Sequence, residues 1–288
     1  MDKLAHTVND VTITYYASGD GFPLVMLHGR GADHRVSLHM LEPVFETRAG
    51  WRRIYPDLPG SGETAASLAI ITQDDMLSIV EQFVIAATGG QRFALGGVSY
   101  GGYLALGIAQ HLADRLDGLL LVVPSVERDR ARQRLPAPQV LVTNPAFEAA
   151  LRPDEEWLRD AVVVQTPSIL EQIRTELLPA LRCADMAFLD RLDAHPAFSF
   201  DLAAADPLWA PALILAGRQD SVTGYRETMG LLERYPRGTF AVLDSAGHML
   251  HREQPVVFRT LVNDWGDRVE MYRANRFIGQ SGAMPPYT

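Results

Sequence analysis

Ser99 is the residue of this 288-residue chain that is best placed for covalent chemistry. It stands in the sequence Gly-Val-Ser-Tyr-Gly-Gly at 97–102, between an apolar run at 93–98 and a helical pattern at 103–113. A sharp turn from a strand into a helix brings the flanking backbones close together, so the positions two before and two after the nucleophile must lack side chains. The pattern predicts a nucleophilic serine on such a turn. The alternative is a glycine-rich turn that serves only helix packing.

His248 is the residue that we expect to act as the base. A serine hydroxyl is a weak nucleophile at neutral pH and needs a group that takes its proton. His248 ends the small-residue sequence Ser-Ala-Gly-His, directly after an expected strand at 240–243, and loops at the carboxyl ends of parallel strands carry the active groups of such sheets. His251 is the alternative base, in or near the following helix. A metal pair of His248 and His251 has no third ligand close by in the sequence, and we expect no metal.

The third member of the expected triad is a carboxylate that orients the imidazole by hydrogen bonding. Asp220 fits this role, because it follows an expected strand at 212–216 through Gly-Arg-Gln and lies between Ser99 and His248 in the chain. Asp244 is the alternative, shortly before His248 in the chain, but its place at a strand end is more typical of a turn cap. We therefore predict Ser99, Asp220 and His248 as nucleophile, acid and base.

The sequence His-Gly-Arg-Gly at 28–31 follows an expected strand at 24–27 and is suited to bind an oxyanion through backbone amides. We expect the amides of Arg30 and Tyr100 to form this oxyanion hole, and His28 to brace the loop by hydrogen bonding. The Arg30 side chain would start close to the reacting carbonyl, where a guanidinium can grip a carboxylate, so we expect it to favour an anionic or strongly polar substrate. The alternative is that Arg30 folds outward, to an acidic neighbour or to solvent.

Apolar runs and amphipathic stretches alternate along both halves of the chain, which predicts an α/β fold with a mostly parallel, doubly wound sheet. Most of the runs are continuously apolar, as expected of strands that helices cover on both faces. The expected strands lie at 11–16, 24–27, 53–55, 93–98, 119–123, 212–216 and 240–243. The expected helices lie at 74–87, 103–113, 225–235 and 254–265.

The alternation stops after the strand at 119–123, where the sequence becomes prone to helix and rich in proline. A stretch of about 85 residues is too long for a loop within a compact domain, so we predict an inserted helical cap at 125–206 and a core at 1–124 and 207–288. The polar end of the chain, 267–288, is typical of a poorly ordered tail. We expect the cap to cover the carboxyl edge of the sheet and to wall the substrate pocket. The residues that we expect to bind substrate are Arg30, Trp157, Phe188 and Trp209.

These motifs resemble those of the α/β-hydrolase superfamily over nearly the whole chain apart from the cap and the tail. The motifs that carry the resemblance are His28-Gly29-x-Gly31, Asp57-x-x-Gly60-x-Gly62, Gly97-x-Ser99-x-Gly101-Gly102, Gly217-x-x-Asp220 and Gly247-His248. Within the superfamily, the chain is similar to the cap-bearing branch of small-molecule esterases and hydrolases of ring-cleavage (meta-cleavage) products. Relatives that open epoxides or remove halogens use an aspartate as nucleophile, so a serine at this position excludes their usual covalent route.

The resemblance implies a serine hydrolase that cleaves a small-molecule carboxylic ester or a similar acyl substrate without a cofactor. The same triad is consistent with hydrolysis of a carbon-carbon bond in a vinylogous diketone. A third hypothesis is a ligand receptor that keeps the fold without activity. The intact set of motifs favours an enzyme over a receptor.

Composition narrows the partners that we expect. The net charge of −9, from 35 acidic and 26 basic residues, argues against a nucleic-acid partner. The sequence contains no run of about 18 apolar residues and no secretory signal at 1–10, so we expect a cytoplasmic protein without a membrane partner. We expect a small-molecule substrate as the partner and leave a homo-oligomer open. The single cysteine, Cys183, cannot form an internal disulfide.

Overall fold

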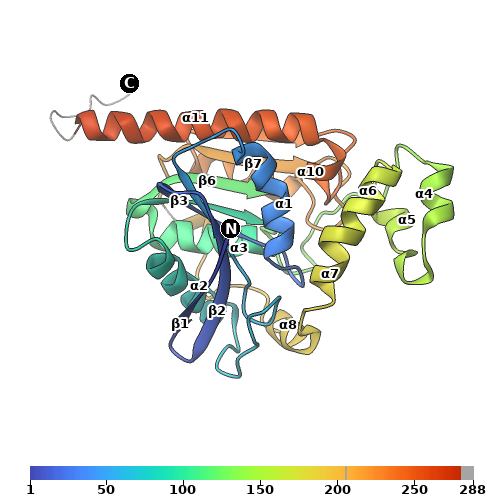
Figure 1. Ribbon diagram of the computed structural model, residues 1–288, viewed down its shortest axis with the longest axis horizontal. Helices are drawn as coiled ribbons and strands as arrows, with labels where there is room; N and C mark the ends of the chain where they lie inside the picture. Colours follow the sequence, from blue (N-terminus) through green and yellow to red (C-terminus); the bar gives the residue numbers. More distant parts are fainter. Residues whose placement is uncertain (205, 280–288) are drawn as a thin grey trace.

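The computed structural model of the chain describes residues 1–204 and 206–279. An eight-stranded sheet forms the centre, with the strand order β1-β2-β4-β3-β5-β6-β7-β8 (Figure 1). Strand β2 is antiparallel to its neighbours β1 and β4, and the other pairs are parallel. The predicted α/β fold with a mostly parallel sheet is therefore confirmed. The strands are β1 (Asp2–Val8), β2 (Val11–Ser18), β3 (Phe22–Leu27), β4 (Trp51–Pro56), β5 (Phe93–Val98), β6 (Leu116–Val122), β7 (Ala212–Gly217) and β8 (Gly238–Leu243).

Helices cover both faces of the sheet (Figure 1). In β3, Val25 and Leu27 belong to the hydrophobic cluster that also holds residues of α2 and α3. Leu24 and Met26 belong to a second cluster, with residues of α1 and α11. This burial on both faces explains why the strand is continuously apolar. These helices are α1 (His34–Phe45), α2 (Gln73–Ala87), α3 (Tyr100–His111) and α11 (Pro255–Gly279). A short helix, η1 (Ala113–Arg115), precedes β6.

The sequence pattern does not predict two elements of the core. Strand β1 is almost wholly exposed and pairs with β2 at the edge of the sheet, so its residues carry no apolar pattern. Helix α1 begins after its N-cap Asp33 and contains Pro43, a residue that disfavours the interior of a helix. The helix expected at 225–235 is instead two short pieces, α9 (Arg226–Met229) and η5 (Leu232–Arg234), because a glycine caps the first of them.

The chain between β6 and β7, which includes the segment expected to form the cap, forms a layer of helices and loops. Most of its helices extend to one side of the sheet (Figure 1). A hydrophobic cluster of their own holds them together, with Phe147, Leu158 and Ile173 fully buried. Helices α6, η3 and α7 follow one another directly, and η3 is a π-helical turn. The helices of this layer are α4 (Pro145–Ala150), η2 (Pro153–Glu155), α5 (Leu158–Ala161), α6 (Pro167–Gln172), η3 (Ile173–Leu177), α7 (Leu178–Leu181), α8 (Met186–Asp193) and η4 (Leu202–Ala204).

The cap meets the loops at the carboxyl edge of the sheet. A Cβ atom built on Gly31, which follows β3, would lie 3.7 Å from Met186 Sδ on α8. One built on Gly60, which follows β4, would lie 2.3 Å from the ring of Phe188 on the same helix. Helix α8 therefore packs directly on the loops at the ends of β3 and β4.

Helix α11 corrects the prediction of a poorly ordered tail at 267–288. The helix continues to Gly279, and residues of the expected tail pack on the core: Val269 is fully buried, and Arg48 forms an ion pair with Glu270 at 2.7 Å. Polar residues that resemble a tail in the sequence are therefore partners of core residues. The remaining residues, 280–288, lie outside the described residues. Neither α11 nor any other described helix is apolar over a length that could cross a membrane.

Candidate active site

Ser99 lies on the turn between β5 and α3, at the carboxyl edge of the sheet. Its φ of 53° and ψ of −115° are unfavourable for a residue with a side chain, and such strain persists mainly at functional positions. The turn is tightly packed, since a Cβ atom on Gly97 would lie 2.2 Å from the Gly101 oxygen, and one on Gly101 would lie 2.3 Å from the Leu27 oxygen. Only glycine fits at both positions, which explains the glycines of the sequence motif.

Asp220 and His248 are in direct contact. His248 Nδ1 lies 3.0 Å from Asp220 Oδ2. The fully buried carboxylate also accepts hydrogen bonds from the Val222 amide at 2.8 Å, the Thr223 amide at 3.1 Å and the Thr223 hydroxyl at 2.8 Å. The two residues follow the neighbouring strands β7 and β8. Because Nδ1 faces the carboxylate, Nε2 is the ring nitrogen that can accept a proton from a nucleophile.

The contact shifts both pKa values. Burial favours the neutral carboxyl of Asp220, but the charge of His248 and the hydrogen bonds from His248 and Thr223 outweigh it and lower the pKa of Asp220. Burial disfavours the imidazolium, but the charge and hydrogen bond of Asp220, with a smaller contribution from the charge of Glu253, outweigh it and raise the pKa of His248 above 6.5. The environment thus favours an ionised aspartate beside a histidine of increased basicity.

Ser99 lies on a loop of the same edge, but no hydrogen bond between the described residues joins it to His248. Hydrogen bonds between catalytic groups are often long until substrate binds. The loop after β3 lies against the serine, because a Cβ atom on Gly29 would be 3.4 Å from Ser99 Cβ and 3.9 Å from Ser99 Oγ. The loops of Asp220 and His248 also touch, since a Cβ atom on Gly217 would lie 2.4 Å from the Gly247 oxygen.

The two alternative residues have other partners. Asp244 Oδ1 accepts a hydrogen bond from Gln219 Nε2 at 2.9 Å. Arg252 Nη1 donates to His251 Nε2 at 2.6 Å. Burial, together with the charge of Arg252, lowers the pKa of His251 well below its usual value. The structure therefore pairs neither Asp244 nor His251 with the members of the predicted triad.

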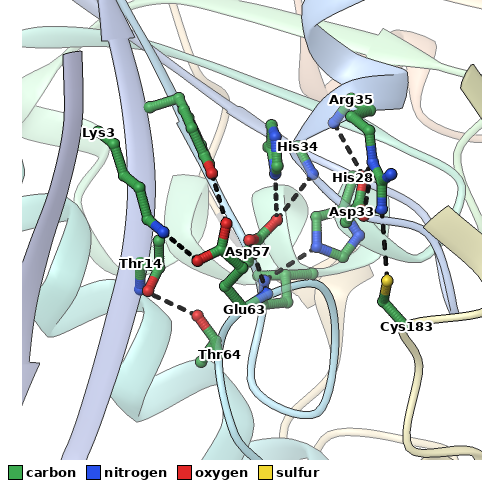
Figure 2. Close-up of polar contacts among 12 residues, drawn as sticks. Lys3, Thr14, His28, Asp33, His34, Arg35, Asp57, Glu63, Thr64 and Cys183 are labelled. Carbon is green, nitrogen blue, oxygen red and sulfur yellow. Dashed lines mark hydrogen bonds and ion pairs between the residues drawn. The ribbon is translucent and has the colours of Figure 1, made fainter. Parts of the chain in front are cut away.

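His28 braces the loop after β3. Its Nδ1 lies 2.8 Å from the Gly29 oxygen, and its Nε2 accepts a hydrogen bond from the Leu58 amide at 2.9 Å. Figure 2 shows the ring among the polar contacts of this region. Burial lowers the pKa of His28, so the neutral form is favoured. Since both ring nitrogens are engaged, the side chain fixes the loop and is not available for proton transfer.

Three side chains with metal-ligating atoms, Asp33, His34 and Asp57, lie within 4.8 Å of one another beside this loop (Figure 2). These atoms bind protein groups. His34 Nδ1 lies 2.8 Å from Asp57 Oδ1, and the Glu63 amide donates to Asp57 Oδ2 at 2.9 Å. The Asp33 carboxylate pairs with the Arg35 guanidinium. The cluster therefore fastens the turn after β4 to the start of α1.

The Arg30 side chain points to the cap. Its Nη2 lies 2.6 Å from Asp190 Oδ1, and its Nε lies 2.7 Å from Asp193 Oδ2, both on α8. Asp193 also pairs with Arg128 at 2.5 Å, and that guanidinium lies 4.6 Å from the centre of the Tyr100 ring. The structure thus places the Arg30 guanidinium with acidic neighbours, which is the alternative considered for it. Its backbone amide stays in the loop beside the nucleophile.

The aromatic residues expected to bind substrate differ in their surroundings. Phe188 is fully buried in the core cluster, beside Gly60, because its ring fills the space that this glycine leaves. Trp157 is 44% exposed at the start of α5. The assignment of Trp209 is wrong, because it lies just before β7, at the amino end of the strand, whereas Asp220 follows the carboxyl end. Its side chain, 57% exposed, belongs to the opposite edge of the sheet.

Three residues around the Asp220–His248 pair are not predicted from the sequence. Thr223 donates to the Asp220 carboxylate, Gln219 Oε1 accepts from the Ala246 amide at 3.1 Å, and Glu253 accepts from the Gly247 amide at 2.6 Å. Thr223 has a local signal, because an acidic residue often accepts hydrogen bonds from the amides that follow it in a turn. Gln219 bonds to the neighbouring loop, and Glu253 bonds back to a residue before its own helix; neither contact follows a sequence pattern.

A mostly parallel sheet that carries a strained serine after one strand and a paired aspartate and histidine after two others has the architecture of the α/β hydrolases. The model of the alpha/beta hydrolase family matches residues 24–261. The chain therefore belongs to this family, as its motifs indicate.

Two curated relatives and a solved structure illustrate the likeness. A 2-hydroxy-6-oxononadienedioate/2-hydroxy-6-oxononatrienedioate hydrolase of Paraburkholderia phymatum is 26% identical over 89% of this chain and 91% of its own. An (E)-2-((N-methylformamido)methylene)succinate hydrolase of Acinetobacter baylyi is 23% identical over 92% and 98%. The crystal structure of an alpha/beta superfamily hydrolase from Oenococcus oeni has a TM-score of 0.84 and 27% identity, and covers 94% of this chain and 100% of its own.

Proposed function

We propose that the chain is a serine hydrolase in which Ser99, Asp220 and His248 cleave a small-molecule carboxylic ester or a similar acyl substrate. The contact between Asp220 and His248, at 3.0 Å, is the observation that carries the proposal. It engages Nδ1 of the imidazole, which leaves Nε2 as the nitrogen that would serve Ser99. His248 then takes the proton of Ser99 as the hydroxyl attacks the carbonyl, and Asp220 stabilises the imidazolium that forms.

Two backbone amides would bind the oxyanion in this mechanism. The Tyr100 amide follows the nucleophile at the start of α3, where helix amides carry partial positive charge. The Arg30 amide follows Gly29, which touches Ser99. His28 supports this arrangement by fixing the loop through both of its ring nitrogens. Water then attacks the acyl-enzyme, with His248 as base again, and releases the acid.

Hydrolysis of a carbon-carbon bond in a ring-cleavage product is a second candidate for the same triad. The likeness to the Paraburkholderia phymatum hydrolase, over 89% of this chain, favours it. In this reaction His248 would first help to move a proton within the substrate. The two reactions share the nucleophile, so the choice between them depends on the substrate.

The test combines labelling with a substrate panel. A fluorophosphonate probe should label the wild type and not the Ser99→Ala variant, because only an activated serine reacts with it. Nitrophenyl esters of short to long acyl chains, assayed beside one ring-cleavage product, decide which bond is cleaved. A wild type that is neither labelled nor active on any of these substrates would support the ligand-receptor hypothesis and overturn the proposal.

A further inference from the structure

The carboxylate of Glu253 is buried between the cap and the loop of His248. Glu253 ends α10 (Leu250–Glu253), the short helix that follows this loop. Its Oε2 accepts a hydrogen bond from the Gly247 amide at 2.6 Å, and its Oε1 accepts one from the Val163 amide at 2.7 Å. Gly247 directly precedes His248, whereas Val163 lies in the cap between α5 and α6. One side chain therefore holds the loop of the base and a segment of the cap.

Apolar contacts join the same two regions on both sides of His248. A Cβ atom built on Gly247 would lie only 2.8 Å from Val163 Cγ2. Met249, on the other side, is buried in the hydrophobic cluster of the cap, with Phe147 and Leu158 among its members. Both chain neighbours of the base thus pack against cap residues.

A buried ion pair adds a third connection. Arg252, which precedes Glu253 in α10, donates from Nη2 to Glu176 Oε2 on η3 at 2.7 Å. The side chain of Arg252 is 3% exposed and that of Glu176 is 16% exposed. Helix α10 therefore binds the cap through two adjacent charged residues, one at η3 and one at Val163.

These contacts depend on one another. The Glu253 carboxylate has left water, and backbone amides of the loop and of the cap replace the lost hydrogen bonds. If the cap moved away, Val163 would withdraw its amide and leave an oxygen of the buried carboxylate unsatisfied. The loop and the cap are therefore stable in this arrangement only together, because the same buried group needs both.

We propose that Glu253 is a positioning residue that makes the placement of His248 depend on the docking of the cap. The catalytic base is then correctly held only while the cap lies in the position seen here. The inference rests on the proposed role of His248 as the base. It assigns to the cap a part in assembling the catalytic groups, in addition to covering the sheet edge.

A steric pair of variants tests the coupling without any change of charge. Gly247→Ala should lower kcat between about tenfold and a hundredfold with little change in KM, because the added methyl group pushes the loop and Val163 apart. Val163→Ala in the same chain removes the obstructing Cγ atoms, so the double variant should recover most of the lost kcat. A Gly247→Ala variant with the wild-type kcat, or a double variant no faster than Gly247→Ala, would overturn the proposal.

Glu253→Gln tests the carboxylate itself. The amide keeps one acceptor but places an NH2 group against an amide N–H, and its neutral side chain no longer raises the pKa of His248. We expect a fall in kcat of about tenfold or more and a lower midpoint for the acid limb of kcat/KM. The other titratable or charged groups near His248 and Glu253 are Asp220 after β7, His251 and Arg252 on α10, and Glu176 on η3, which pairs with Arg252.

Glu155→Gln is the matched control, since Glu155 is also a fully buried glutamate but lies within the cap, where it binds the Arg152 amide and Arg174. Glu155→Gln should reduce thermal stability without moving the midpoint of the acid limb of kcat/KM. Equal kcat and equal midpoints in the two glutamine variants would overturn the inference.

Fluorophosphonate labelling separates failure of this inference from failure of the proposed function. If the wild type is labelled at Ser99 while Glu253→Gln keeps the wild-type kcat and midpoint, the positioning role is wrong and the serine hydrolase stands. If the wild type is not labelled, Ser99 is not activated and His248 does not act as its base. Both proposals then fail, because Glu253 has no base to position.

Discussion

Asp220 and Asp244 show how the surroundings of a carboxylate decide its role. Asp220 is fully buried and holds His248, whereas Asp244 pairs with Gln219 at the surface of the same loops. We expect Asp220→Asn to lower kcat about 10⁴-fold, because the amide no longer selects the imidazole tautomer that leaves Nε2 unprotonated. Asp244→Asn should stay within about threefold of the wild type. Steady-state ester hydrolysis measures both, and the reverse order would assign the acid to Asp244.

The pKa of His248 predicts the acid limb of the pH profile. The base must be neutral to accept the proton of Ser99, and Asp220 raises the pKa of His248 above 6.5. Activity is lost as pH falls through the raised pKa, so the midpoint of the acid limb of kcat/KM should lie above 6.5. Asp220→Asn should move the midpoint down, with Asp244→Asn as the control that leaves it in place. A wild-type midpoint below 6.5 would contradict the pairing.

Much of the candidate site is predictable at this scale because its residues follow strands. Ser99, Asp220 and His248 each lie on the segment that follows an apolar run, in the chain order typical of the family. Glu253 has no such signal, because its partner Val163 is far away in the sequence. The glutamate in α10 looks like any polar residue of a surface helix, and only the folded chain shows that it is buried.

At the scale of elements, prediction succeeds where burial dictates composition. The interior strands are apolar on both faces, and all seven that the sequence pattern predicts are present. The two elements that the sequence pattern misses have separate causes. Strand β1 is exposed and held by backbone hydrogen bonds, and α1 contains a proline. The backbone pairing that fixes an edge strand is the same for every sequence, so it leaves little trace in residue types.

Helix α8 and the loop after β3 are joined by the ion pairs of Arg30, which predicts how this residue affects specificity. Its guanidinium is engaged by Asp190 and Asp193, so it is not directed at substrate. Arg30→Met should therefore lower kcat/KM equally, within about threefold, on matched neutral and carboxylate-bearing esters. Arg191→Met, which removes an arginine of α8 that lies over Phe188, is the control. A loss of about tenfold or more on the anionic ester alone would instead make Arg30 a selectivity residue.

At the scale of the whole molecule, the position of the cap on the core is the feature that is hardest to predict from the sequence. The boundaries of the insertion follow from the break in the alternating pattern, but its position depends on contacts such as Arg30 with Asp190, 160 residues apart. Surface ion pairs of this kind contribute about 1 kcal/mol or less each. The cap is therefore placed by many weak contacts together with its own hydrophobic cluster, and no single motif encodes that sum.

Helix α11 allows a test of whether residues of the expected tail contribute to the core. Val269 of α11 is fully buried, and a Cβ atom built on Gly118 of β6 would lie 2.6 Å from Val269 Cγ2. We expect Val269→Ala to lower the free energy of unfolding by about 2 kcal/mol, through lost burial and the space left behind. Met271→Ala, at a position 59% exposed, should change it by about 0.5 kcal/mol or less. Urea unfolding followed by fluorescence measures both. If both variants left the free energy of unfolding nearly unchanged, the prediction of a poorly ordered tail would be correct, because a side chain in such a tail has no packing to lose.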